Sequence, residues 1–268
     1  MTIVALVIVA LLAGLLGSML GVGGGVVLVP VMSLFLGVPL KTAIATSLVC
    51  VVATSSASQV AYVGRGLTNT RLGMTLEIGT TLGALLGGMT AVFISGRVLY
   101  GVFAGVLIYV VASMERRLAA DVPPGAAVRG LPAQFTDPLT GETRRYGVRR
   151  YSVGLPASFV AGDVSALLGV GGGIIKVPIM NLAMGVPLRV SIATSNLMIG
   201  VTAATGAIVY YGHHLVSPRY AVPAALGVLV GAELGPHVAG RLSTRVLRRL
   251  FQALLVILAV QMAVKVVG

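Results

Sequence analysis

Residues 21–30 read GVGGGVVLVP, and residues 169–178 read GVGGGIIKVP. Each copy lies inside a long apolar run, where an uninterrupted helix would otherwise be expected. Three adjacent glycines lose too much backbone freedom to form a stable helix, and the proline that follows has no amide hydrogen to donate. Non-helical backbone at membrane depth is tolerated only where protein buries it or where it lines a cavity. The two copies therefore predict two local helix breaks and a functional site beside them.

Composition places the chain in a membrane. Hydrophobic residues make up 57% of the 268 residues and charged residues 10%, whereas soluble domains carry about a quarter charged residues. The net charge of +12 could suggest nucleic acid, but no basic residue precedes Lys41, and most others lie in short loops or between Arg116 and Arg150. This pattern is typical of charges that orient a protein in the lipid bilayer. We expect an all-α polytopic membrane protein that binds no nucleic acid.

Ten apolar segments follow one another along the chain. A membrane-spanning helix needs roughly 20 residues, and the second and seventh segments are shorter, so we expect them to be half-helices that follow an unwound point. The segments fall near residues 2–20, 22–36, 42–63, 72–94, 97–114, 152–168, 170–184, 190–211, 219–240 and 244–267.

The second series of segments repeats the first. Adding 148 to a position in the first half gives its counterpart without a gap, and residues 21–47 and 169–195 share 17 identities in 27 positions. We therefore divide the chain into a transmembrane repeat at 1–114, a basic linker at 115–150 and a second transmembrane repeat at 151–268. Internal repeats with matched helix breaks are typical of secondary transporters, whose site lies near the midplane where the repeats meet.

The charges favour inverted-topology repeats. With the arginine-rich segment 115–150 in the cytoplasm, loops 64–71 and 241–249 also lie inside, while their less basic counterparts near 212–219 and 95–97 lie outside, as the positive-inside rule requires. Both termini are then outside. In the central segment, residues 137–141 predict a turn, which leaves open a small hairpin or a mobile segment, and a plain linker or a regulatory role.

The glycine motifs are candidate anion sites. Breaking a helix exposes backbone N–H groups and the positive end of a half-helix, which together bind anions. A nucleotide-binding loop is excluded because no G-K-[ST] follows either copy. Close helix packing is the alternative for glycines in a membrane. It fits better the glycines that recur every four residues, which are Gly79, Gly83, Gly87, Gly227, Gly231 and Gly235.

Hydroxyl side chains recur after each glycine motif. Ala-Thr-Ser occurs at residues 45–47 and again at 193–195, and Asn196 replaces Leu48 in the second copy. Such hydroxyls either bond back to a carbonyl of their own helix or face a cavity and hold substrate oxygens. Recurrence in both halves favours the cavity, and Asn196 makes the site asymmetric.

Several ionisable residues fall within apolar segments, where they are functional candidates by default. Asp163 and Lys176 flank the second glycine motif, and leucines replace them in the first half. They form either a structural ion pair, or a site in which Lys176 attracts an anion and Asp163 exchanges a proton. Glu77 and Glu233 are either proton-coupling groups or carboxylates bonded to a neighbouring helix.

These motifs resemble those of a known family. The two glycine motifs, the G-V-P-L-[KR]…A-T-S segments at 37–47 and 185–195 and the gapless duplication are similar to the sulfite exporter TauE/SafE family, also described as 4-toluene sulfonate uptake permeases. The resemblance covers nearly the whole chain except 115–150. It implies a permease for small sulfur-containing anions, such as sulfite, sulfoacetate or related sulfonates, in a prokaryotic plasma membrane.

We therefore predict a secondary transporter that moves such an anion by alternating access, with an anion channel on the same scaffold as the alternative. We expect no enzyme, cofactor or metal site, because the histidines are only three and the single Cys50 has none near it in sequence. Direction, coupling ion and oligomeric state stay open, and proton coupling is assigned to Asp163, Glu77 or Glu233. The predicted substrate-binding residues are Gly23, Gly24, Gly25, Thr46, Ser47, Gly171, Gly172, Gly173, Lys176, Thr194, Ser195 and Asn196.

Overall fold

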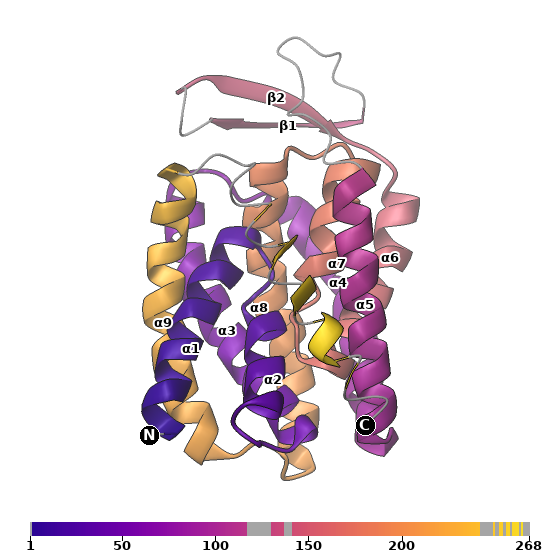
Figure 1. The fold of residues 1–268 in the computed structure, drawn as a ribbon. Coiled ribbons are helices and arrows are strands. Elements are labelled where there is room, and N and C mark those ends of the chain that lie inside the picture. Colours follow the sequence, from indigo (N-terminus) through magenta and orange to yellow (C-terminus); the bar gives the residue numbers. More distant parts are fainter. Residues whose placement is uncertain are drawn as a thin grey trace.

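The chain forms a bundle of helices with a β-hairpin across one end (Figure 1). The computed structural model describes residues 2–116, 130–136 and 141–241, together with residues 249, 252–253, 256–257, 259–262 and 264. The first half contains α1 (Thr2–Leu20), α2 (Gly25–Leu34), α3 (Leu40–Gly64), α4 (Thr70–Phe93) and α5 (Gly96–Arg116). The second half contains α6 (Tyr151–Leu168), α7 (Gly173–Pro178), the π-helix η1 (Ile179–Ala183), α8 (Leu188–Gly212) and α9 (Pro218–Arg241).

The helix boundaries repeat along the chain as the sequence does. Both ends of α3 and α8 differ by 148 residues, and so do both ends of α4 and α9. The two halves differ after the second break, where α7 gives way to the π-turn η1, while α2 continues as α-helix. The last expected segment, 244–267, falls largely outside the described residues.

Six of the described helices are long and apolar enough to cross a membrane, namely α1, α3, α4, α6, α8 and α9. Large apolar side chains on their outer faces are exposed, including Ile78 and Leu82 on α4 and Val222 and Leu226 on α9. By contrast, the ten-residue α2 is about 15 Å long, at 1.5 Å per residue. The expectation of a polytopic helical membrane protein with short helices after the glycine motifs is confirmed.

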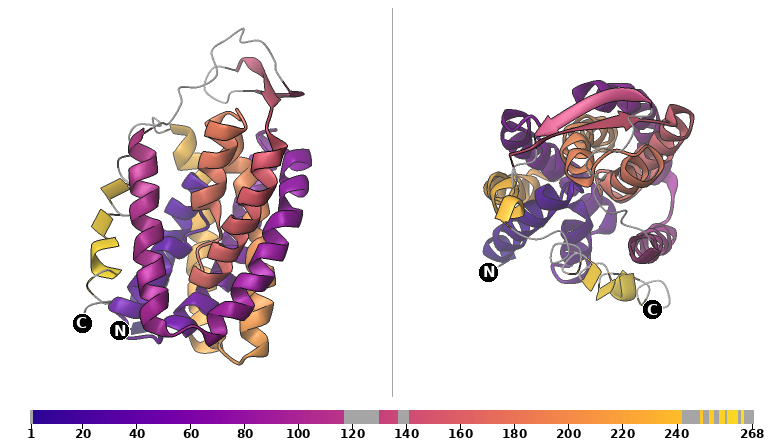
Figure 2. Two further views of the ribbon diagram at one scale, coloured as in Figure 1. Left: turned by 90° about the vertical axis from the view of Figure 1, so that its right-hand side faces the viewer. Right: turned by 90° about the horizontal axis from the view of Figure 1, so that it is seen from above.

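The central segment adds a hairpin to the helices. Strands β1 (Leu131–Thr136) and β2 (Thr143–Val148) pair antiparallel, with Leu131 opposite Val148 and Thr136 opposite Thr143. The hairpin lies across the end of the bundle (Figure 2). Of the two possibilities for this segment, the structure has the hairpin. Of the turn predicted at 137–141, which follows β1 in the sequence, only Gly141 is described, and residues 117–129 also lie outside the described part.

Tyr146 attaches the hairpin to the helices. Its ring packs against Phe135 in a cluster that includes Leu67 and Val186. The Tyr146 hydroxyl accepts a hydrogen bond from Asn69 Nδ2 at 2.9 Å, and burial raises the pKa of this phenol above its usual value. The backbone N–H of Asn69 in turn donates to Thr194 Oγ1 at 3.0 Å. A short polar chain thus connects the hairpin with a predicted site residue.

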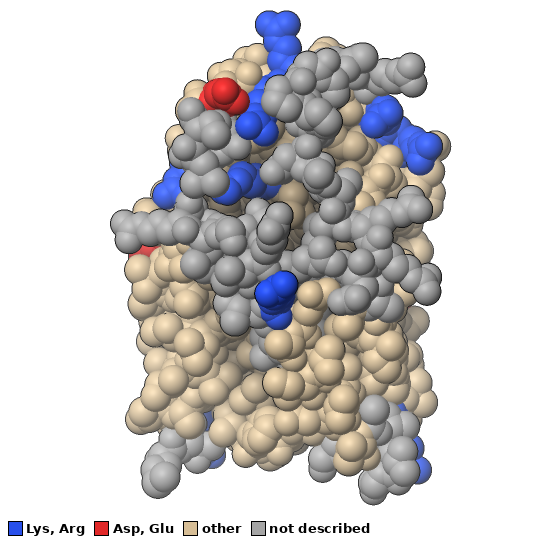
Figure 3. All heavy atoms as spheres, turned by 45° about the horizontal axis from the view of Figure 1, so that its top comes forward, with Lys and Arg blue, Asp and Glu red and all other residues tan. Residues whose placement is uncertain are grey.

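Basic side chains gather at the hairpin end of the bundle (Figure 3). Loop 65–69 and the segment before α8 pack against the hairpin, so they share this end with it, whereas the loop between α8 and α9 lies at the other end. This arrangement agrees with the relative placement of loops 64–71 and 212–219 expected from their charges. The described arginines in or near the hairpin end are Arg65, Arg71, Arg144, Arg145, Arg149, Arg150 and Arg189.

Helices of one half pack against helices of the other. The main pairs are α1 with α9, α4 with α6, and α3 with α8. Glycine stripes allow two of these contacts, because a Cβ atom on Gly83 would overlap the carbonyl oxygen of Phe159, and one on Gly231 would overlap that of Leu11. Phe159 and Leu11 are themselves 148 positions apart. The packing interpretation of these stripes is confirmed, and each stripe joins the two halves.

We expect Gly83→Ala and Gly231→Ala each to lower the stability of the protein by about 1–3 kcal/mol, because the added methyl group forces two closely packed backbones apart. The measurement is the fraction that stays monodisperse in detergent after heating. Gly105→Ala on α5 is the matched control, since no atom of the described residues lies within 4 Å of its added methyl group. If all three variants unfold at the same temperature as the unchanged protein, the close approach of these helices is not required for stability.

Candidate functional site

Both glycine motifs interrupt their helices. Helix α1 ends at Leu20 and α2 begins at Gly25, and the same interruption separates α6 from α7. In each break three glycines have positive φ: 71°, 84° and 76° at residues 21, 23 and 24, and 72°, 77° and 71° at residues 169, 171 and 172. Side chains rarely adopt this left-handed conformation, so these positions favour glycine. The predicted unwinding is confirmed, and all of this backbone is buried.

The two breaks lie directly against each other. A Cβ atom on Gly25 would overlap the carbonyl oxygen of Gly169, and one on Gly173 would overlap that of Gly21. Hydroxyl groups fasten the contact from both sides: Ser47 Oγ donates to the carbonyl oxygen of Gly169 at 2.7 Å, and Ser195 Oγ donates to that of Gly21 at 2.8 Å. Each half therefore holds the broken backbone of the other.

Helices α2 and α7 both begin at this contact, at Gly25 and Gly173. The first hydrogen bonds after each break come from residues 27 and 28 to the carbonyl oxygen of Gly24, and from residues 175 and 176 to that of Gly172, at 3.1–3.2 Å. The N–H groups at the starts of α2 and α7 precede these bonds and have no partner inside their helices. They are the groups that bind anions at helix N-termini.

An apolar pair lies over the breaks. A Cβ atom on Gly23 would lie 2.8 Å from Val51 Cγ1 and 3.0 Å from Ile199 Cδ1, and one on Gly171 would lie 3.0 Å from Val51 Cγ1. Val51 and Ile199 are counterparts on α3 and α8, the two central helices that pack on each other. The middle of the contact is therefore covered by aliphatic side chains.

The other predicted polar residues differ in what they have left to offer a substrate. Thr46 Oγ1 and Asn196 Oδ1 are both buried, and neither atom has a hydrogen-bond partner. Asn196 Nδ2 donates to the carbonyl oxygen of Ser18 at 2.9 Å, and Thr194 Oγ1 accepts from Asn69. The hydroxyl hydrogens of Ser47 and Ser195 are committed to protein carbonyls. Of the predicted hydroxyls, Thr46 is the one with no partner at all.

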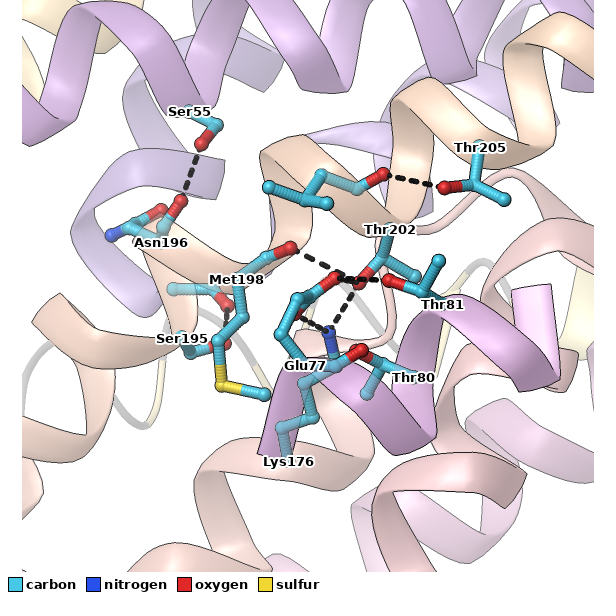
Figure 4. A network of polar contacts seen from close by, with 12 residues as sticks. Ser55, Glu77, Thr80, Thr81, Lys176, Ser195, Asn196, Met198, Thr202 and Thr205 are labelled. Carbon is cyan, nitrogen blue, oxygen red and sulfur yellow. Dashed lines mark hydrogen bonds and ion pairs between the residues drawn. The ribbon is translucent and has the colours of Figure 1, made fainter. Parts of the chain in front are cut away.

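Lys176 and Glu77 share a buried polar network (Figure 4). Lys176 is 2% exposed and Glu77 6%. Lys176 Nζ donates to Thr202 Oγ1 at 2.8 Å, and Thr202 Oγ1 donates to Glu77 Oε1 at 2.8 Å. The ammonium nitrogen itself lies 3.9 Å from Glu77 Oε2. A hydroxyl from α8 therefore bridges a cation on α7 and a carboxylate on α4.

Of the two alternatives for Asp163 and Lys176, the ion pair between them is wrong in its partner. Lys176 pairs with Glu77, because α4 packs beside α6 and α8 and brings its carboxylate to the start of α7. Asp163 is only half-buried, and its backbone lies against Gly87 on α4. For Glu77, the expectation of a carboxylate bonded to a neighbouring helix is met. Sequence reasoning missed Thr202, a hydroxyl in an apolar run whose counterpart Thr54 bonds to its own helix.

The remaining ionisable candidates lie outside this network. Glu233 is exposed on α9, next to the exposed apolar residues Val230 and Leu234. His213 and His214 are exposed at the end of α8. Among the described residues, no group of three or more His, Cys, Asp and Glu side chains could hold a metal ion. The polar chemistry of the described interior is thus centred on the breaks and on Lys176.

We expect Lys176→Met and Glu77→Gln each to destabilise the protein by about 3–5 kcal/mol, because each leaves an uncompensated group in the interior. The double variant should recover part of this loss, since neither charge is then present. The readout is thermal unfolding in detergent, with Glu142→Gln on the exposed hairpin as a control. Single losses that simply add in the double variant would contradict the pairing of the two groups.

Comparison with known proteins agrees with this architecture. The model of the family "Sulfite exporter TauE/SafE" matches residues 6–262. The chain is 29% identical to the "Probable membrane transporter protein YunE" of Bacillus subtilis, over 98% of this chain and 97% of the relative. It is 27% identical to a "Probable membrane transporter protein" of Xylella fastidiosa (97% and 95%) and 24% identical to the "Probable membrane transporter protein MJ0441" of Methanocaldococcus jannaschii (93% and 91%). No solved structure matches. The chain is a membrane transporter of the TauE/SafE type and belongs to the sulfite exporter TauE/SafE family.

Proposed function

We propose that this protein is a secondary transporter that moves a small sulfur-containing anion, such as sulfite or an organosulfonate, across the plasma membrane by alternating access. The observation that carries the proposal is the pair of buried helix breaks whose backbones touch across the two halves. Broken helices that meet near the membrane midplane form the substrate sites of many secondary transporters. The family match supports the class of substrate.

The two halves act as inverted-topology repeats in this proposal. Helix α1 begins at the end of the bundle away from the hairpin, and its counterpart α6 begins at the hairpin end (Figure 1). Equivalent contacts occur in both directions: Tyr62 donates to the carbonyl oxygen of Ser18, and the counterpart Tyr210 donates to that of Ala166. Such an exchange of roles lets the halves rock about one site and open it to either side.

The anion is bound at the breaks. The free N–H groups after Gly24 and Gly172 supply uncharged donors, the Thr46 hydroxyl supplies another, and Lys176 supplies the positive charge. Uncharged donors hold an anion without trapping it in a full buried ion pair. Ser47 and Ser195 do not bind the anion in this proposal, because their hydroxyls donate to carbonyl oxygens of the two breaks and hold the breaks together.

The arginine-rich hairpin end faces the cytoplasm in this proposal. The described basic residues concentrate at that end, as the positive-inside rule requires. The membrane is a prokaryotic plasma membrane, which is consistent with relatives from bacteria and an archaeon. Val51 and Ile199, which cover the breaks, would have to move apart for an anion to pass.

The decisive experiment is uptake into proteoliposomes of purified protein, with sulfite, thiosulfate, sulfoacetate and taurine as the panel. We expect saturable uptake of at least one of the sulfur-containing anions and acceleration of that uptake by unlabelled anion on the opposite side. Both follow from a site that is exposed to one side at a time. Flux that does not saturate and shows no counterflow indicates a channel, and no flux of any of the four compounds contradicts the proposal.

Thr46→Val tests the placement of the anion. It should weaken binding about 10–100-fold, as expected for a lost hydrogen bond to a charged group worth about 1.5–3 kcal/mol. The matched control is Thr54→Val on the same helix, whose hydroxyl bonds to the carbonyl oxygen of Cys50. Binding is measured by the anion-dependent shift in thermal stability. If the two variants bind the anion with equal affinity, Thr46 does not contact it.

A further inference from the structure

Lys176 lies between two possible partners. It is on the first turn of α7, and a Cβ atom built on Gly172 would lie 3.2 Å from Lys176 Cε, so the lysine stem passes beside the second break. Its ammonium group ends at Thr202 and Glu77. From this geometry we propose that Glu77 and the transported anion are alternative partners of Lys176, so that one proton enters Glu77 for each anion bound. This inference rests on the proposed function and names its coupling group.

The contact between Lys176 and Glu77 is suited to exchange. The ammonium group forms its hydrogen bond with Thr202, and Glu77 Oε2 has no hydrogen-bond partner at all. Glu77 Oε1 accepts from Thr202 at 2.8 Å, with Thr81 Oγ1 farther away at 3.4 Å. The carboxylate balances the charge of the lysine through an intervening hydroxyl. The distance of 3.9 Å between Lys176 Nζ and Glu77 Oε2 leaves the ammonium group able to turn to another anion.

A polar group beside the break can receive that anion. Ser165 Oγ is fully buried and has no hydrogen-bond partner. A Cβ atom on Gly172 would lie 3.2 Å from Ser165 Cβ, the same distance as from Lys176 Cε. The serine hydroxyl and the lysine therefore lie beside the same glycine. An anion there would meet a hydroxyl donor, a cation and the amide groups at the start of α7.

Electrostatics links the anion to the proton. Two negative charges on one buried cation repel each other strongly in a medium of low dielectric constant. A proton taken from water onto a carboxylate oxygen of Glu77 removes one of them, leaving a neutral carboxylic acid beside Thr202. Lys176 then balances the anion alone. The anion and the proton thus enter together, and neither the charge of the lysine nor any covalent bond of the substrate changes.

The surroundings single out Glu77 as the group that takes the proton. Against α4 pack α6, which carries Tyr151 and Asp163, and α8, which carries Arg189, Tyr210 and Tyr211, while α4 itself carries Arg71. Among the described residues, the ion pair of Glu77 is with Lys176 alone. In the other half of the chain the counterpart of Glu77 is Ala225 and that of Lys176 is Leu28, so the arrangement occurs once and predicts one proton per anion.

The test measures protons taken up when sulfoacetate or thiosulfate binds to the purified protein in weakly buffered detergent solution. Both probes stay ionised near neutral pH, so any proton taken up goes to the protein. We expect about one proton per bound anion, and a dissociation constant that rises about tenfold per pH unit where Glu77 is ionised in the free protein. Both measurements use the unchanged protein and need no variant to fold.

Glu77→Gln mimics the protonated carboxyl group. We expect it to bind the anion with no proton uptake and with an affinity that is independent of pH near neutrality. Asp163→Asn and Glu233→Gln remove the carboxyl groups of α6 and α9 and should keep about one proton per anion. Binding by the unchanged protein without proton uptake overturns this inference and leaves the transporter intact, as does proton uptake that persists in Glu77→Gln. If neither probe nor any other anion of the panel binds, the proposed function itself fails.

Discussion

The contact between the two glycine breaks is the constraint on which the rest of the structure depends. Each break places a backbone carbonyl where a side chain of the other break would stand, so glycine is required on both sides. Ser47 and Ser195 complete the contact from opposite directions. Because the contact is made by backbone, it fixes where α1 and α6 end and where α2 and α7 begin. The helix N-termini are thereby brought together in the interior.

Such an arrangement is costly unless something satisfies its polar groups. Unpaired amide groups away from water cost several kcal/mol each, and Thr46, Ser165 and Asn196 add buried oxygens without partners. A protein whose interior needed only to be stable would fill these positions with apolar side chains. Four of the buried side-chain atoms without a partner lie near the breaks or Lys176, namely Thr46 Oγ1, Ser165 Oγ, Asn196 Oδ1 and Glu77 Oε2. An anionic substrate would accept hydrogen bonds from the amide groups and from the Thr46 and Ser165 hydroxyls.

Much of this architecture is predictable from the sequence, for particular reasons. The offset of 148 residues predicts equivalent helices in the two halves, and the observed ends of α3, α4, α8 and α9 follow it. The helix breaks are equally predictable, because three glycines and a proline act locally on the backbone. The turn residues at 137–141 left open a hairpin or a mobile segment, and they did not indicate that Tyr146 would attach the hairpin to Asn69.

The site is less predictable because its contacts join distant parts of the chain. The sequence around Lys176 does not indicate that it pairs with Glu77, because the pairing depends on how α4 packs against α6 and α8. The direction of a hydroxyl is equally hidden: Ser47 and Thr46 are adjacent on one helix, yet one bonds to the opposite break and the other has no partner. A repeated motif therefore predicts where a site lies better than it predicts which atoms face the ligand.

Three polar residues near the second break depart from the symmetry of the two halves. Lys176 stands where the first half has Leu28, Ser165 where it has Gly17, and Asn196 where it has Leu48. All three lie in the second half, near a break whose backbone geometry matches that of the first. The matched breaks provide a scaffold that two equivalent halves can share, while the added polar groups make those halves chemically different. On the proposed function, symmetry supplies the two alternating states and the asymmetric cluster around Lys176 makes binding in them unequal. A ligand shifts the equilibrium between two states only by the difference in its affinity for them.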